Sequence, residues 1–233
     1  MPNLRKLREE YSSGYYSVPS FGAGTANTEF ETMTGMNLDD FGPGEYPYKT
    51  ILQKTACESV GYDLKKYGYK INALHDNKGN FYQRNTVFSR LGYDQFTSLE
   101  YIYDYEENPT DWAKDDCLVD EITGMLKYSP EKDFIYCISV QGHGKYPEDT
   151  SDMNLKIKVT GNDVTGNPNG FEYYVNQVYE MGKFVARLVE EVSKIDEHTI
   201  IVFYGDHLPT FDINDSDLVL SLIYISAPTR LLS

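Results

Sequence analysis

The sequence predicts an α/β protein with a mainly parallel sheet flanked by helices. The first observation is a pair of continuous apolar runs, at residues 134–140 and 199–204, that are rich in β-branched and aromatic side chains. Such runs are typical of strands buried on both faces of a parallel sheet. The second is the alternation of strands with helical stretches, which is the pattern of α/β folds. The third is that three of the four histidines directly follow predicted strands, where open α/β sheets place their sites.

The N-terminal part is predicted to be mostly helix and loop. Residues 2–10 are expected to form a short charged helix, and residues 14–19 an extended segment. Two glycines, then small polar residues and an apolar run, indicate that residues 21–30 are a loop that enters a helix. Residues 37–48 are punctuated by glycine and proline, which predicts a loop.

The rest of the chain alternates between helices and strands, as the period of its apolar residues indicates. Helices are expected over residues 55–67, 85–91, 114–126 and 170–194. Strands are expected over residues 70–75, 133–140 and 199–204. Loops are expected over residues 141–147 and 150–168.

Length and composition suit one large domain or two small ones. The 233 residues are 40% hydrophobic, which supports a sizeable core. No boundary is recognised within residues 1–217, whereas residues 218–233 are predicted to be an atypical apolar tail of separate origin. The formal net charge of −15 disfavours binding to nucleic acid.

Composition disfavours several other functions. The three cysteines form no CxxC pair, so neither a zinc knuckle nor a thioredoxin-type motif is present. No stretch has the apolar length of a membrane span, and the N-terminus lacks the apolar region of a signal peptide. The 21 tyrosines could line a groove for a sugar or polyol, but we favour the interpretation that they are ordinary surface and core residues.

Thr25 is the first candidate for chemistry. It follows Phe21-Gly22-Ala23-Gly24 and precedes a predicted helix. Free N–H groups and the helix dipole at such an N-terminus stabilise an anion. A threonine hydroxyl becomes a nucleophile only when a base or a metal lowers its pKa. An N-cap role for Thr25 is the alternative.

Polar residues at the ends of predicted strands are further candidates. Asp206 and His207 follow Gly205, and an oxygen donor beside a nitrogen donor makes half of a metal site. His143, flanked by glycines, could act as a general acid or hold a phosphate oxygen. Arg84 could clamp a phosphate by a forked contact. A polar turn, a loop histidine and a surface arginine are the alternatives.

The familiar motifs for other chemistries are absent. The chain has no GxxxxGK[ST], no GxGxxG, no HExxH and no GxSxG. The remaining candidates predict a metal-assisted attack by a hydroxyl group on a phosphorus or sulfur ester.

Four motifs occur in the order and spacing of a known family: residues 21–30, 81–84, 139–143 and 204–207. Together they resemble the extracellular catalytic domain of lipoteichoic acid synthases and related phosphoglycerol transferases, in the sulfatase branch of the alkaline phosphatase superfamily. The resemblance covers about residues 2–212. It implies an alkaline phosphatase/sulfatase-like fold.

The resemblance also implies roles for single residues. Thr25 matches the nucleophile of the family, which also contacts the metal, and Asp206 and His207 match two metal ligands. The implied metal is Mn²⁺, with Mg²⁺ or Zn²⁺ as alternatives.

Substrate contacts are implied in the same way. His143 matches the histidine that contacts the phosphoglycerol group, and Arg84 matches a phosphate-binding arginine. Tyr82 stands where lipoteichoic acid synthases often carry tryptophan, and His75 is expected near the same pocket.

The implied reaction moves phosphoglycerol from phosphatidylglycerol to a glycerol-ended glycolipid or polyglycerolphosphate-type polymer through a phospho-threonine. It would take place at the extracellular face of the bacterial cell membrane, with the full-length enzyme anchored by N-terminal spans. A phosphodiesterase or sulfatase of the same superfamily is an alternative, although Thr25-Ala26-Asn27 lacks the C/S-x-P-x-R setting of sulfatases. An inactive domain that binds a glycan or polymer is the other alternative.

The sequence departs from the family at both ends. The first metal ligand of the family is a glutamate on a strand just before the segment that matches Pro2-Asn3-Leu4, and the resemblance ends near Asp212. The domain is therefore expected to be truncated at both ends, with weak Mn²⁺ binding and low activity.

Overall fold

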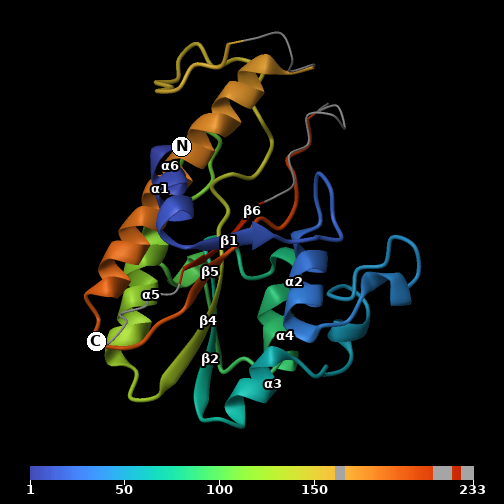
Figure 1. The fold of residues 1–233 in the computed structure, drawn as a ribbon. Helices are drawn as coiled ribbons and strands as arrows, with labels where there is room; N and C mark the ends of the chain where they lie inside the picture. The colour runs from blue at the N-terminus through green and yellow to red at the C-terminus, as the bar shows by residue number, and fades with distance from the viewer. Residues whose placement is uncertain (161–165, 212–221, 227–233) are drawn as a thin grey trace.

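The computed structural model describes residues 1–160, 166–211 and 222–226, and it contains two three-stranded sheets (Figure 1). The first is parallel, with the order β3 (Gln95–Ser98), β2 (Tyr69–His75) and β4 (Lys132–Ile138). His75 is in register with Ser98 and with Ile138, so the three strands end at one edge. The predicted α/β class and the alkaline phosphatase/sulfatase-like fold are confirmed.

The second sheet corrects one prediction. Its order is β1 (Ser12–Tyr15), β6 (Leu222–Ser226) and β5 (Ile201–Phe203), and both pairings are antiparallel. The run at residues 199–204, expected to be buried on both faces of a parallel sheet, therefore supplies an antiparallel strand. Val202 is 51% exposed, while its neighbours in β5 are half-buried. The strand is covered on one face only, as antiparallel strands often are.

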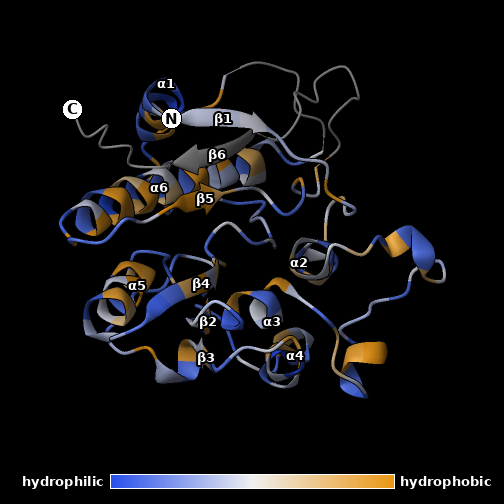
Figure 2. Ribbon diagram, turned by 60° about the horizontal axis from the view of Figure 1, so that its bottom comes forward, coloured by the Kyte–Doolittle hydropathy of each residue, from blue (hydrophilic) through white to orange (hydrophobic). Residues whose placement is uncertain are grey.

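Two hydrophobic cores cover opposite faces of β2, because successive side chains of a strand point to opposite faces. Ile71 and Ala73 pack with α2 (Thr25–Thr34), α3 (Val60–Lys65) and α4 (Arg84–Arg90). Leu74 packs with a second group of helices, namely α1 (Pro2–Glu10), α5 (Cys117–Tyr128) and α6 (Pro168–Ser193). Figure 2 shows α5 on one side of the parallel sheet and α3 and α4 on the other.

The expected helices form, with different boundaries. The helix expected over 55–67 is α3, which begins only after Ser59, whose side chain accepts a hydrogen bond from the backbone N–H of Gly61 at 3.2 Å. Strand β3 was not anticipated, because Gln95–Ser98 is short and mixed in polarity. Short 3-10 turns complete the fold at Leu38–Asp40, Ile51–Gln53, Phe81–Gln83 and Leu99–Tyr101.

The predicted domain boundary near residue 217 lies outside the described residues. Of the tail at 218–233, the structure describes β6 alone. None of the described helices combines the length and apolar character needed to cross a membrane.

Candidate active site

Thr25 is the first residue of α2, and Gly24 before it takes the N-cap position. Gly24 has φ of 109° and ψ of 31°, which L side chains rarely adopt, and a Cβ there would lie 2.8 Å from Ser20 Oγ. The alternative N-cap role for Thr25 is therefore wrong. Its hydroxyl stands instead in the first helical turn, where N–H groups and the helix dipole favour an anion.

The loop of Asp206 and His207 is fastened to α2. Thr28 Oγ1, three residues after Thr25, donates to the backbone carbonyl of Asp206 at 2.7 Å across 178 positions of sequence. The N–H of Gly22 donates to the carbonyl of Leu208 at 3.0 Å. Thr25 and Asp206 consequently line the same cavity, as the motif order implied.

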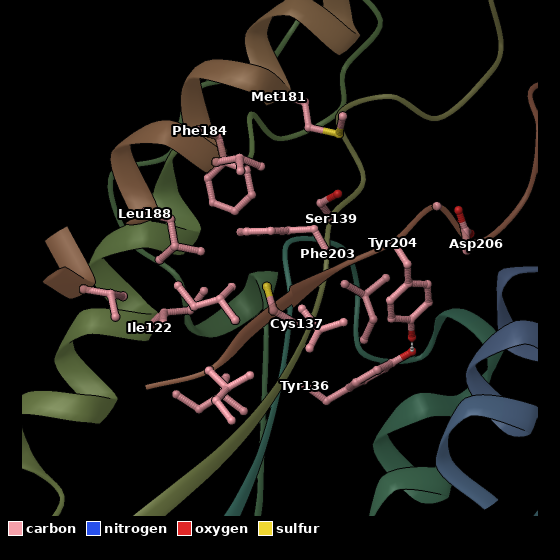
Figure 3. A pocket seen from close by; sticks show the side chains of 18 of the residues that line it. Ile122, Tyr136, Cys137, Ser139, Met181, Phe184, Leu188, Phe203, Tyr204 and Asp206 are labelled. Atoms are coloured by element: carbon pink, nitrogen blue, oxygen red, sulfur yellow. Dashed lines mark hydrogen bonds between the residues drawn. The ribbon is translucent and has the colours of Figure 1, made fainter. Parts of the chain in front are cut away.

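The cavity lies between the two sheets and has a volume of about 440 Å³ (Figure 3). Its body is apolar, with Phe184 of α6 facing Cys137 of β4 and Phe203 of β5. Consecutive residues of β4 and of β5 line it, so the cavity runs along the edges of both strands. Asp206 lies at one end, and Thr25 and Glu29 are also part of the lining.

Asp206 and His207 form an adjacent oxygen and nitrogen donor pair. His207 Nε2 lies 3.4 Å from Asp206 Oδ2, and His207 Nδ1 donates to the carbonyl of Leu208 at 2.8 Å. That donation leaves the Nε2 lone pair free for a metal. Among the described residues, however, no group of three or more histidine, cysteine, aspartate or glutamate side chains could hold a metal ion. The donor chemistry suits Mn²⁺, but the set is short of a full coordination shell.

We expect the chain to bind Mn²⁺ weakly, with a dissociation constant of about 1 mM or higher, because two ligating side chains and a hydroxyl leave most of the shell to water. Titration calorimetry measures this directly. Asp206→Asn should remove the residual binding, whereas Asp116→Asn, on an exposed side chain, should not. Micromolar binding of one Mn²⁺ would show that the described residues underestimate the site.

Arg84 forms a fully buried ion pair with Glu29 of α2. Arg84 Nε lies 3.2 and 3.1 Å from the two carboxylate oxygens, and Nη2 also donates to Oε1. The two side chains are 1% and 2% exposed. Burial alone would lower the pKa of Arg84, but the charge and hydrogen bonds of Glu29 outweigh it and raise that pKa. Phosphate binding by Arg84 stays a prediction.

His143 and Tyr82 are joined by ring contacts. The exposed His143 ring lies 6.3 Å from Phe81, and Phe81 lies 4.8 Å from Tyr82. Arg84 lies 5.2 Å beneath the Tyr82 ring. Burial raises the pKa of Tyr82, and the charge of Asp206 adds to that rise. Tyr82, Arg84, His143 and Asp206 therefore gather at one end of the molecule.

A family model described as Sulfatase matches residues 1–219. The chain belongs to the sulfatase family. The predicted membership in the sulfatase branch of the alkaline phosphatase superfamily is confirmed. The name describes descent, since the nucleophile setting of sulfatases is absent here.

Relatives of this sulfatase-family chain modify cell-surface polymers, to judge from their names. A putative cyclic β-1,2-glucan modification protein of Rhizobium meliloti is 30% identical over 90% of the chain, and lipoteichoic acid synthase 2 of Bacillus subtilis is 25% identical over 88%. The chain spans 32% and 31% of these two proteins.

Solved structures share the sulfatase-family fold. The phosphoglycerol transferase GacH of Streptococcus pyogenes, in complex with sn-glycerol-1-phosphate, superposes with a TM-score of 0.81 at 25% identity, covering 97% of this chain and 61% of that one. Lipoteichoic acid synthase LtaP of Listeria monocytogenes gives 0.76 at 19% identity, covering 98% and 60%.

In this sulfatase-family chain His75 lies beneath the site. It is 2% exposed, its Nδ1 donates to the carbonyl of Ile138 at 2.9 Å, and its buried Nε2 has no hydrogen-bond partner in the structure. Burial, together with the charge of Arg84, lowers its pKa to about 3, so the ring is neutral. A direct substrate contact by His75 stays a prediction.

A pair of buried carboxyl groups in this sulfatase-family fold was not anticipated. Asp76 and Asp115 are both 0% exposed, and neither oxygen of Asp76 has a hydrogen-bond partner in the structure. Burial raises the pKa of Asp115 to about 6, and burial with repulsion from Asp115 raises that of Asp76. Asp115 lies among helix-forming residues of ordinary polarity, so only the folded chain shows the pairing.

Asp76→Asn should stabilise the protein at pH 8 and leave it almost unchanged at pH 4. Because folded pKa values above the ordinary range bind protons more tightly in the folded state, stability falls as the pH rises from about 4 through 6. Removing one charge should restore about 2 kcal/mol at pH 8. Urea unfolding of both proteins at both pH values measures this. An equal gain at both pH values would contradict it, and exposed Asp116→Asn is the control.

Proposed function

We propose that the chain transfers phosphoglycerol from phosphatidylglycerol to a glycerol-ended glycolipid or polyglycerolphosphate-type polymer, with a phospho-threonine at Thr25 as intermediate. The observation that carries the proposal is a threonine hydroxyl at a helix N-terminus that lines one cavity with Asp206. The likeness to GacH, solved with sn-glycerol-1-phosphate, supports the choice of phosphoglycerol. The lipid donor places the reaction at a membrane surface, on the extracellular face of the bacterial cell membrane.

The reaction has two displacements. Oγ of Thr25 attacks phosphorus, the new Oγ–P bond forms, and the P–O bond to diacylglycerol breaks. A hydroxyl of the acceptor then attacks the same phosphorus and releases Thr25. The exposed His143 can give a proton to the leaving oxygen in the first step and take one from the acceptor in the second.

Fixed groups of the chain stabilise the charge that develops on phosphorus. The N–H groups of the first turn of α2 point at the space beside Thr25 Oγ. Arg84 adds a positive charge behind Tyr82. A divalent cation, Mn²⁺ or else Mg²⁺ or Zn²⁺, would have Asp206 and His207 among its ligands, and it would lower the pKa of the Thr25 hydroxyl and polarise the phosphate.

The test uses the whole chain at high concentration with fluorescent phosphatidylglycerol and millimolar Mn²⁺. We expect labelled diacylglycerol, and a phosphoglycerol adduct on the peptide that contains Thr25 by mass spectrometry. No diacylglycerol with Mn²⁺, Mg²⁺ or Zn²⁺, from protein that circular dichroism shows to be folded, would refute the proposal. An adduct on another residue would refute the role of Thr25.

A further inference from the structure

A continuous row of aromatic rings runs along the rim of the candidate site. We call it the aromatic arc. Neighbouring ring centroids are 6.1, 4.8, 6.3 and 4.7 Å apart along the series Tyr46, Tyr82, Phe81, His143 and Trp112. The rings come from segments far apart in the sequence, so the row is a product of the fold.

The rings of the arc remain open to solvent. Phe81 is 37% exposed, His143 is exposed, and the other three are half-buried, whereas core rings such as Phe30 are 1% exposed. Tyr82 and the following Gln83 have φ of 55° and 60°, a backbone conformation that non-glycine residues rarely adopt. Strained backbone of this kind gathers at ligand sites.

A lysine stands at each end of the arc. Lys49 Nζ lies 4.8 Å over the Tyr46 ring and 5.2 Å over the Tyr82 ring. Lys145 lines a hollow of about 370 Å³ with Trp112 and Tyr146. Within the described part of the chain, the lysines that form ion pairs are others. These two ammonium groups are therefore open to an anionic ligand, in a chain of net charge −15.

The hollow beside Lys145 is held in shape before any ligand arrives. The Tyr146 hydroxyl donates to the carbonyl of Gly142 at 3.2 Å, and its ring stacks on Phe211 at 4.5 Å. A fixed wall reduces the conformational entropy that binding would cost.

We propose that the aromatic arc binds an extended chain of polyol or sugar units that carries phosphate groups. The rings would contact the C–H faces of the units, while Lys49 and Lys145 would pair with phosphates. The arc passes through His143, so such a chain would present its end to the site as the acceptor. Only this assignment as acceptor rests on the proposed function.

Trp112 is the sole tryptophan of the chain, so its fluorescence reports on the arc. The probe is a glycerol phosphate hexamer, added without donor lipid and without a divalent cation. We expect a saturable change in emission that 0.5 M NaCl weakens by about tenfold. Inorganic phosphate and uncharged maltohexaose should give no comparable change. Equal binding of maltohexaose would overturn the phosphate requirement, and no response to the hexamer would overturn the proposal.

Variants locate the binding. By calorimetry, Lys145→Ala and Tyr46→Ala should each weaken hexamer binding by about fivefold. The matched controls are Lys132→Ala, whose ammonium lies 5.6 Å over the Tyr69 ring in the part of the sheet away from the site, and Tyr128→Ala, an 88% exposed tyrosine. Equal losses in the controls would overturn the proposal. Thr25→Ala should bind the hexamer like wild type, so failed transfer would leave this result standing.

Discussion

Replacing Thr25 by alanine should reduce diacylglycerol release by at least about a thousandfold, to the background without protein. The variant removes the oxygen that forms the bond to phosphorus and leaves the helix intact, since alanine is the best helix former. Release of fluorescent diacylglycerol is measured with the proteins at equal concentration, together with the mass of the peptide that contains residue 25.

Two matched variants separate chemistry from folding. Thr25→Ser keeps a hydroxyl at the same place and should retain measurable release and the adduct. Thr34→Ala removes a hydroxyl from the last residue of the same helix, where Oγ1 donates to the carbonyl of Phe30 at 2.7 Å, and should act like wild type. If Thr25→Ala released as much diacylglycerol as wild type, the covalent route would be wrong.

Local signals in the sequence predict the elements that carry the candidate site. The long helix α6 and strand β2 follow the period of their apolar residues, and the helix after Thr25 follows two glycines and small polar residues. The position of Thr25 as first residue rather than N-cap needs the backbone of Gly24, which only the fold defines.

Pairings between distant residues could not be predicted, because no local pattern specifies them. The partner of β5 is antiparallel although its composition is that of a buried parallel strand. Glu29 and Arg84 are 55 positions apart, and nothing around Arg84 indicates that its charge is balanced inside the protein. Trp112 lies in a polar stretch and joins the site only through its contact with His143.

The buried pair also bears on how Arg84 would meet a phosphate. Glu29 is one helical turn after Thr25, so the carboxylate holds the guanidinium close to the base of the helix that carries the nucleophile. A carboxylate that fixes an arginine orients its remaining N–H groups. We infer that Glu29 acts on phosphate binding, if at all, through the position of Arg84.

Glu29→Ala should destabilise the fold by about 3–5 kcal/mol, because it leaves the guanidinium of Arg84 buried without a countercharge. Urea unfolding at pH 7 measures the loss. The matched control is Glu10→Ala, which breaks the exposed Lys6–Glu10 pair of 3.8 Å on α1 and should cost less than about 0.5 kcal/mol.

A double variant decides whether charge imbalance is the cause. Replacing both partners, as Glu29→Leu with Arg84→Met, removes the two charges together and should recover most of the stability that Glu29→Ala loses, since a buried ion pair is often no more stabilising than apolar residues of similar size. A double variant as unstable as Glu29→Ala would instead assign the loss to packing around α2. A loss below about 1 kcal/mol in Glu29→Ala would mean that the Arg84 guanidinium reaches water or another anion.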